Sequence, residues 1–171
     1  MAATACSSGS TPAATLRVLP GAFGPGVFVT SVTGDGHGGW AAVGWSTGAD
    51  GQPATACFFS HDATSWQACP LHAVDTDGHH TRLLGVAHLG SKLIAGGVAV
   101  GALHGNLRPY LWTGTPDRLD ELNLARELFG GERIITFDGL AAGPLGGFAV
   151  GTWDGVTHQS VAQVWRSDDG T

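Results

Sequence analysis

A repeat with a period of 53 to 54 residues constrains the fold more than any other feature of this sequence. Three apolar stretches, GWAAVGW, KLIAGGV and GFAVGTW, carry a glycine at the same point, namely Gly44, Gly97 and Gly151. The next stretches, ATACFFS, RPYLWT and VAQVWRS, end with the same spacing at Ser60, Thr113 and Ser167. Because two independent landmarks share one period, the sequence predicts a repeat protein with units of about 50 residues.

Each unit has the pattern of three successive antiparallel strands, a polar turn and a fourth strand. A further apolar stretch opens each unit, at 27–33, 82–88 and 133–142, and a short turn containing glycine follows it. Four antiparallel strands in about 50 residues are typical of a β-propeller blade. The sequence therefore predicts an all-β, β-propeller-type fold with about three four-stranded blades, the last one incomplete. We place the blades at about 26–70, 79–125 and 132–171.

The fourth strands are expected at 66–69 and at about 119–124, and the helix-like stretch 119–132 is expected to mix an outer strand with a turn or a short helix. Residues 1–14 are predicted to be a flexible tether, and 15–171 the partial propeller, with 15–20 as a spare outer strand. Closed propellers use four or more blades. The chain is therefore expected to be a fragment of a longer propeller, or a half-propeller that pairs with a second copy to make six blades. Pairing of the two chain ends is another possible closure.

Composition excludes two classes of partner. The net charge is −6, and Lys92 is the single lysine, so the basic surface that nucleic-acid binding requires is missing. No apolar run reaches the roughly 18 residues that a membrane-spanning helix needs. We expect no nucleic-acid partner and no transmembrane segment.

The polar turns resemble the Asp-box of the bacterial neuraminidase repeat, a feature of the sialidase-like β-propeller superfamily. Its shorter pattern is Ser-x-Asp-Gly-x-Thr-Trp, and the resemblance covers about 27–171. The matching residues are Ser60, Asp62 and Trp66 in SHDATSW and Ser167, Asp169 and Gly170 in SDDGT. The middle copy, TGTPDRL, keeps only the hydroxyl of Thr113. Short Asp and Ser side chains fix a turn by accepting backbone amide hydrogen bonds, so these residues are predicted to be structural, with Trp66 covering the base of the hairpin.

Catalytic residues are not expected in this chain. Sialidases use an arginine triad, a tyrosine nucleophile paired with a glutamate, and an acidic proton donor. The only tyrosine, Tyr110, lies within an apparent strand, and Arg133-Ile134-Ile135 lacks the proline of the sialidase Arg-Ile-Pro string. Glu132 and Asp138 flank that stretch, but nothing in the sequence places them together.

We therefore predict a non-catalytic binding or scaffold domain whose ligand is a carbohydrate or a protein. The alternative is a fragment of a sialidase-like glycoside hydrolase whose catalytic residues lie in missing blades.

No metal site or cofactor is predicted. The loop VDTDGHH contains Asp75, Asp77, His79 and His80, but a calcium loop needs more oxygen ligands than this stretch offers. Three other histidines lie in hairpin loops, at His37, His104 and His158. We interpret them as solvated loop residues; the alternative is that they line one surface.

The cysteines bear on the cellular compartment. Cys57 and Cys69 are equidistant from Ala63, the centre of the first polar turn, so a cross-strand disulfide or a pair of reduced thiols is expected. A disulfide would imply an oxidising compartment. The segment MAATACSSGSTPAAT resembles the lipidation junction of bacterial lipoproteins, which would make Cys6 an acylated residue; the alternative is a cytoplasmic N-terminus with an incidental cysteine. We predict an extracytoplasmic location, with the protein either secreted or attached to the cell envelope through a lipid anchor.

Overall fold

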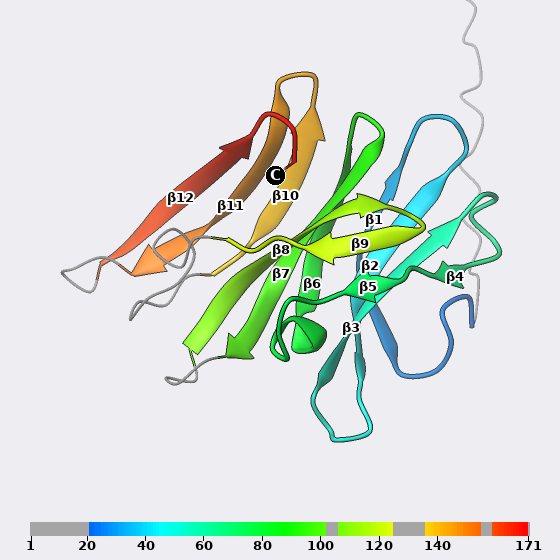
Figure 1. The fold of residues 1–171 in the computed structure, drawn as a ribbon, viewed down its shortest axis with the longest axis horizontal. Coiled ribbons are helices and arrows are strands. Elements are labelled where there is room, and N and C mark those ends of the chain that lie inside the picture. The colour runs from blue at the N-terminus through cyan, green and yellow to red at the C-terminus, as the bar shows by residue number, and fades with distance from the viewer. Residues whose placement is uncertain (1–20, 102–105, 125–135, 155–158, 171) are drawn as a thin grey trace, which may run out of the picture.

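The structure is a computed structural model that describes residues 21–101, 106–124, 136–154 and 159–170. Short β-strands and one 3-10 turn make up the regular structure of these residues (Figure 1). The elements are β1 (Val27–Gly34), β2 (Trp40–Thr47), β3 (Pro53–Ser60), β4 (Gln67–Ala68), β5 (Leu71–His72), η1 (Gly78–His80), β6 (Arg82–Leu89), β7 (Lys92–Gly101), β8 (Asn106–Thr115), β9 (Arg118–Glu121), β10 (Gly139–Gly143), β11 (Gly146–Asp154) and β12 (Ser160–Ser167).

The strands form three separate sheets that follow one another along the chain. The first sheet has the order β1-β2-β3-β4, the second β5-β9-β8-β7-β6 and the third β10-β11-β12. Neighbouring strands are antiparallel, apart from the two-residue strand β5, which pairs in parallel with β9. The predicted all-β fold class is confirmed.

The first strands of the three sheets lie side by side, with β6 between β1 and β10 (Figure 1). Thr30 Oγ1 on β1 donates a hydrogen bond to the carbonyl oxygen of Leu83 on β6 at 2.6 Å. The amide of Val86 donates to Ser31 Oγ at 3.3 Å. The remaining strands of each sheet follow outward from these inner strands, which is the arrangement of a partial β-propeller.

The repeat glycines have a steric role at the inner strands. A β-bulge interrupts β1 between Val29 and Ser31, and another interrupts β6 between Leu83 and Gly85. A Cβ atom on any of the three repeat glycines would collide with a backbone carbonyl oxygen, that of Phe28 for Gly44, of Arg82 for Gly97 and of Thr136, just before β10, for Gly151. The 53-to-54-residue period therefore marks the point where each second strand passes closest to its inner strand.

The main core lies between the first and second sheets. Ala41, Val43 and Cys57 of the first sheet contact the apolar face of the second sheet. The buried members of that face are Leu83, Val86, Leu93, Ala95, Trp112 and Leu119. Alternation along β2 and β7 explains this packing, because every second residue of a strand points to the same face of its sheet.

Three local features differ from the sequence-based expectation. Strand β5 was not predicted, because a two-residue strand carries no periodicity; it is positioned by the amide of Leu119, which donates to the carbonyl of Pro70 at 2.9 Å. The outer strand of the second sheet, β9, ends at Glu121, and β10 begins at Gly139 instead of near 133. Residues 1–20 and the helix-like part of 119–132 beyond Leu124 lie outside the described residues. No helix in the described ranges is long and apolar enough to cross a membrane.

Candidate functional site

The first polar turn follows β3 and is held by one carboxylate. Asp62 Oδ1 accepts the amide hydrogens of Ser65 at 2.7 Å and Thr64 at 2.8 Å, and the hydroxyl of Ser60 at 3.0 Å. The Asp62 amide in turn donates to Ser60 Oγ at 3.2 Å. The hydrogen bonds from Ser65 and Thr64 hold the pKa of Asp62 well below its usual range. Ser60 and Asp62 therefore act within the turn, and Ala63 has a left-handed conformation with φ of 58°.

The third sheet ends on a similar turn after β12. Ser167 Oγ donates to Asp169 Oδ1 at 3.2 Å and accepts the amide of Gly170 at 2.8 Å. Gly170 supplies the left-handed conformation, with φ of 79°. In the second sheet the same place is a two-residue hairpin between Thr115 and Arg118, which agrees with its degenerate sequence.

Trp66 is half-buried and lies outside the core. Its ring is 4.7 Å from the ring of Phe23, which also packs edge-on against Phe58 at 5.2 Å. The segment before β1 therefore covers the outer part of the first sheet. Sequence reasoning placed Trp66 at this hairpin but not Phe23, because residues before the first strand carry no repeat signal.

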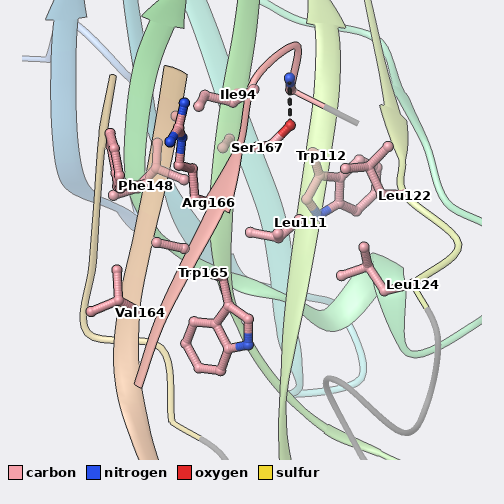
Figure 2. A pocket seen from close by; sticks show the side chains of 15 residues that line it. Ile94, Leu111, Trp112, Leu122, Leu124, Phe148, Val164, Trp165, Arg166 and Ser167 are labelled. Carbon is pink, nitrogen blue, oxygen red and sulfur yellow. Dashed lines mark hydrogen bonds between the residues drawn. The ribbon is translucent and has the colours of Figure 1, made fainter. Parts of the chain in front are cut away.

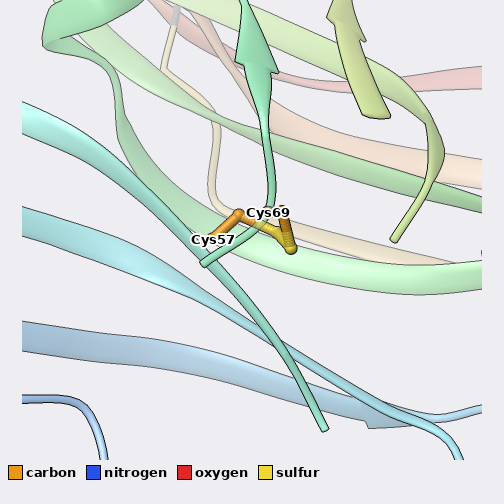
Figure 3. The surroundings of a disulfide bond; sticks show 2 residues. All are labelled: Cys57 and Cys69. Carbon is orange, nitrogen blue, oxygen red and sulfur yellow. A yellow bond between two sulfur atoms is a disulfide. The ribbon is translucent and has the colours of Figure 1, made fainter. Parts of the chain in front are cut away.

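Cys57 and Cys69 form a disulfide bond between β3 and the residue after β4 (Figure 3). Both side chains are buried, and both belong to the core between the first two sheets. Cys6 lies outside the described residues. The bond therefore ties the outer edge of the first sheet to the core.

Tyr110 is half-buried on β8, as expected of a packed strand residue. Burial raises the pKa of its phenol above the usual value, and the carboxylates of Asp75, Asp77 and Glu121 act in the same direction. Such a tyrosine stays protonated at neutral pH. No group of His, Cys, Asp or Glu that could hold a metal ion occurs among the described residues.

The remaining candidates from the sequence do not form a common site. The loop that carries Asp75, Asp77, His79 and His80 is fixed by local contacts: the Gly78 amide donates to Asp75 Oδ1 at 3.0 Å, and His80 Nδ1 lies 2.9 Å from the Pro53 carbonyl oxygen. The exposed His37 lies in the β1–β2 turn. His104, His158, Glu132 and the string Arg133–Ile135 lie outside the described residues.

A different surface appears where the inner strands begin. The rings of Phe28 on β1 and Trp45 on β2 are stacked, with centroids 4.3 Å apart and planes 18° apart. The guanidinium of Arg82, at the start of β6, lies over the Trp45 ring at 4.9 Å from its centroid. Phe28 remains 51% exposed although it is a large apolar residue, and Arg82 is exposed as well.

The third sheet adds a carboxylate at the equivalent place. Asp138 is exposed, and its Oδ2 accepts the hydroxyls of Thr136 and Thr152, each at 3.2 Å. The Thr152 amide donates to Thr136 Oγ1 at 2.9 Å, which fixes the pair. These bonds orient the carboxylate and leave its other oxygen, Oδ1, for a further donor.

We call these six residues the axial surface: Phe28, Trp45, Arg82, Thr136, Asp138 and Thr152. Phe28, Arg82 and Thr136 are equivalent by the repeat, since the carbonyl oxygen of each lies against the glycine of its own unit. Because β1 and β3 run in the same direction, the polar turn after β3 lies at the opposite end of the first sheet from Phe28. The axial surface was missed by sequence reasoning, because its residues differ in type from unit to unit and only the glycine beneath them recurs.

The structure also contains an apolar pocket of about 430 Å³ between the second and third sheets (Figure 2). Its walls include Ile94, Leu111, Leu122, Phe148 and Trp165. Its charged lining residue, Arg166, is paired with Asp168 at 2.7 Å. Ligand sites usually combine apolar walls with several converging polar groups. The axial surface combines an aromatic pair with a guanidinium and an oriented carboxylate, whereas the charged side chain that lines the pocket is already paired.

Comparison with known proteins gives no family assignment. No protein-family model matches the chain, and no curated protein matches it. Among solved structures, the chain is similar to a glycosyl hydrolase from Bacteroides ovatus, with 10% identity and a TM-score of 0.45, over 85% of this chain and 48% of that one. It is also similar to a mannose phosphorylase from Leishmania mexicana, with 13% identity and a TM-score of 0.44, over 84% of this chain and 44% of that one. The chain thus spans about half the length of these structures.

Proposed function

We propose that this chain is part of a non-catalytic, extracytoplasmic β-propeller binding domain of the Asp-box type, and that its axial surface binds a carbohydrate. The observation that carries the proposal is the stacked pair of Phe28 and Trp45, with Phe28 half-exposed at the end of an inner strand. A stacked aromatic pair at the surface leaves apolar area in contact with water, which is unfavourable. Such pairs are typical of sites that bind another flat apolar surface.

The chemistry around the pair favours a sugar over a purely apolar ligand. A sugar ring has a C–H face that can lie on an aromatic ring, and hydroxyls around its edge that donate and accept hydrogen bonds. Arg82 offers guanidinium donors beside Trp45. Asp138 offers an oriented hydrogen-bond acceptor at the third sheet. A mixed surface of this kind can hold both parts of a carbohydrate.

Titration with a panel of soluble oligosaccharides tests the proposal, using calorimetry together with tryptophan fluorescence. The panel contains neutral hexose, amino-sugar and uronic-acid oligomers. We expect saturable binding of at least one class, and we expect Trp45→Ala to weaken it about tenfold or more, equivalent to about 1.4 kcal/mol. Trp66→Ala is the matched control, because it removes a tryptophan at the far end of the first sheet. Absence of binding across the panel, or equal binding by Trp45→Ala, would refute the proposal and favour a protein ligand.

The buried disulfide supports the extracytoplasmic part of the proposal, because such bonds persist in oxidising compartments. A lipid anchor at Cys6 stays a proposal from the sequence. Mass spectrometry of the protein isolated from its own cell fraction tests both points. We expect Cys57 and Cys69 to resist alkylation without reductant, and Cys6 to carry the added mass of an acylated glyceride.

A hydrolase fragment is the second candidate, and Asp138 is the observation that favours it. An oriented, exposed carboxylate at the axial end could act on a bound glycoside, although most glycoside hydrolases need a second carboxylate at a defined separation. Release of sugar from the panel oligomers that is abolished by Asp138→Asn would establish this candidate over the non-catalytic one.

A further inference from the structure

The repeat allows the same position to be compared in all three sheets. We call the face of a sheet that points to the following sheet its front, and the opposite face its back. Val29 on β1, Leu83 on β6 and Phe137 just before β10 occupy equivalent back-face positions, because each follows the residue whose carbonyl oxygen meets the glycine of its unit. Leu83 is 0% exposed and Phe137 is 2% exposed, because each packs toward the preceding sheet, whereas Val29 of the first sheet is 38% exposed.

The front faces show the opposite trend. Val43, Gly96 and Val150 are equivalent residues on the second strands of the three sheets. Val43 is 0% exposed and Gly96 is buried, but Val150 is 42% exposed, and its cross-strand partner Val164 is 65% exposed. The front of the third sheet therefore exposes Val150 at a position that is buried in the first two sheets, and no described residue of the chain covers it.

We infer that the front of the third sheet binds the back of the first sheet in a second copy of this chain. Both interfaces inside the chain join a front to the next back, so the third-sheet front continues an existing kind of contact and requires a back face. The first-sheet back supplies one. Phe23 covers its outer part at Phe58, while Val32 on the inner strand is 51% exposed.

Two copies can make this contact twice, once in each direction, so the assembly closes with two-fold symmetry. The three sheets of each copy then make a ring of six, which lies within the usual range of propeller blade numbers. In the closed ring, the third-sheet front and the first-sheet back are both covered. This inference does not depend on the proposed carbohydrate ligand.

Sedimentation and light scattering of the full chain across a wide concentration range test the inference. We expect a particle of twice 17.4 kDa. Val164→Glu on the front and Val32→Glu on the back should each give a monomer, because each places a charge in both interfaces of the dimer. Leu145→Glu is the matched control: Leu145 is more exposed than either residue but lies in the β10–β11 turn, so this variant should remain a dimer.

Mixing the two interface variants gives the sharpest test. In a dimer of Val164→Glu with Val32→Glu, one interface carries both charges, and the other joins an intact front to an intact back. The mixture should therefore form a heterodimer, which neither variant alone can do. A wild-type monomer at every concentration would overturn the inference. So would dimers of Val32→Glu, which would indicate front-to-front pairing. A mixture that stays monomeric would also overturn it, because an intact front and an intact back would then fail to bind each other. Far-UV circular dichroism verifies that each variant is folded.

Discussion

The first and third sheets end their third strand on the same kind of turn but place a different residue at its left-handed position. In the first sheet the Asp62 carboxylate accepts two backbone amides and a hydroxyl, and the left-handed residue is Ala63. In the third sheet Ser167 accepts the amide of Gly170, and the left-handed residue is the glycine. The same turn is thus held around an alanine in the first sheet, with two backbone amides on the Asp62 carboxylate, and around a glycine, which favours the left-handed conformation, in the third.

The largest effect on the free energy of unfolding should come from the repeat glycine, which both sheets have. Gly44→Ala and Gly151→Ala each place a methyl group on a backbone carbonyl oxygen, that of Phe28 or of Thr136. Because backbone must move to relieve the collision, we expect each variant to lose about 3 kcal/mol of unfolding free energy, measured by urea denaturation.

Gly143→Ala is the control for both variants, because an added Cβ at that position meets no atom within 4 Å. It should change the free energy of unfolding by less than about 0.5 kcal/mol. If Gly44→Ala were as stable as Gly143→Ala, the steric explanation of the repeat would be wrong.

The same glycines show how far the sequence could predict the fold. Gly44, Gly97 and Gly151 recur because a backbone carbonyl oxygen lies so close to each that no side chain fits, so the spacing alone located the sheets. The axial surface was not predictable in this way. Phe28, Arg82 and Thr136 share a position but no chemistry, and the stacking of Phe28 on Trp45 depends on a cross-strand register that a bulge shifts by one residue.

The second comparison concerns pH. The pKa of Asp62 is lower in the folded protein than in the unfolded chain, mainly because the Ser65 and Thr64 amides donate to the carboxylate. The stabilisation is therefore complete above the unfolded pKa of about 4 and is lost as the pH falls below it. We expect the melting temperature of the wild type to fall more between pH 6 and pH 3 than that of Asp62→Ala, measured by circular dichroism.

Asp117→Ala is the matched control for this pH experiment, because Asp117 is an exposed carboxylate in the two-residue hairpin that takes the place of this turn in the second sheet. Its melting temperature should follow the wild-type pH dependence closely. Parallel curves for the wild type and Asp62→Ala would show that the carboxylate does not hold the first turn.

The smallest effect on the free energy of unfolding should come from exchanging alanine and glycine at the left-handed position, and it should have opposite signs in the two turns. A left-handed conformation strains an alanine but not a glycine, while glycine also gives the unfolded chain more conformational freedom. At Ala63, with φ of 58°, the relief of strain should slightly exceed this cost, so Ala63→Gly should raise the free energy of unfolding by about 0.5 kcal/mol. Gly170→Ala should lower it by about 1 kcal/mol or more, because the new methyl group is also close to Ile94, whose Cγ2 lies 2.9 Å from the position of an added Cβ. Urea denaturation of both variants measures the change in the free energy of unfolding and therefore the sign of each effect. A loss of stability in Ala63→Gly would mean that the hydrogen bonds to Asp62 leave no strain at Ala63 for a glycine to relieve.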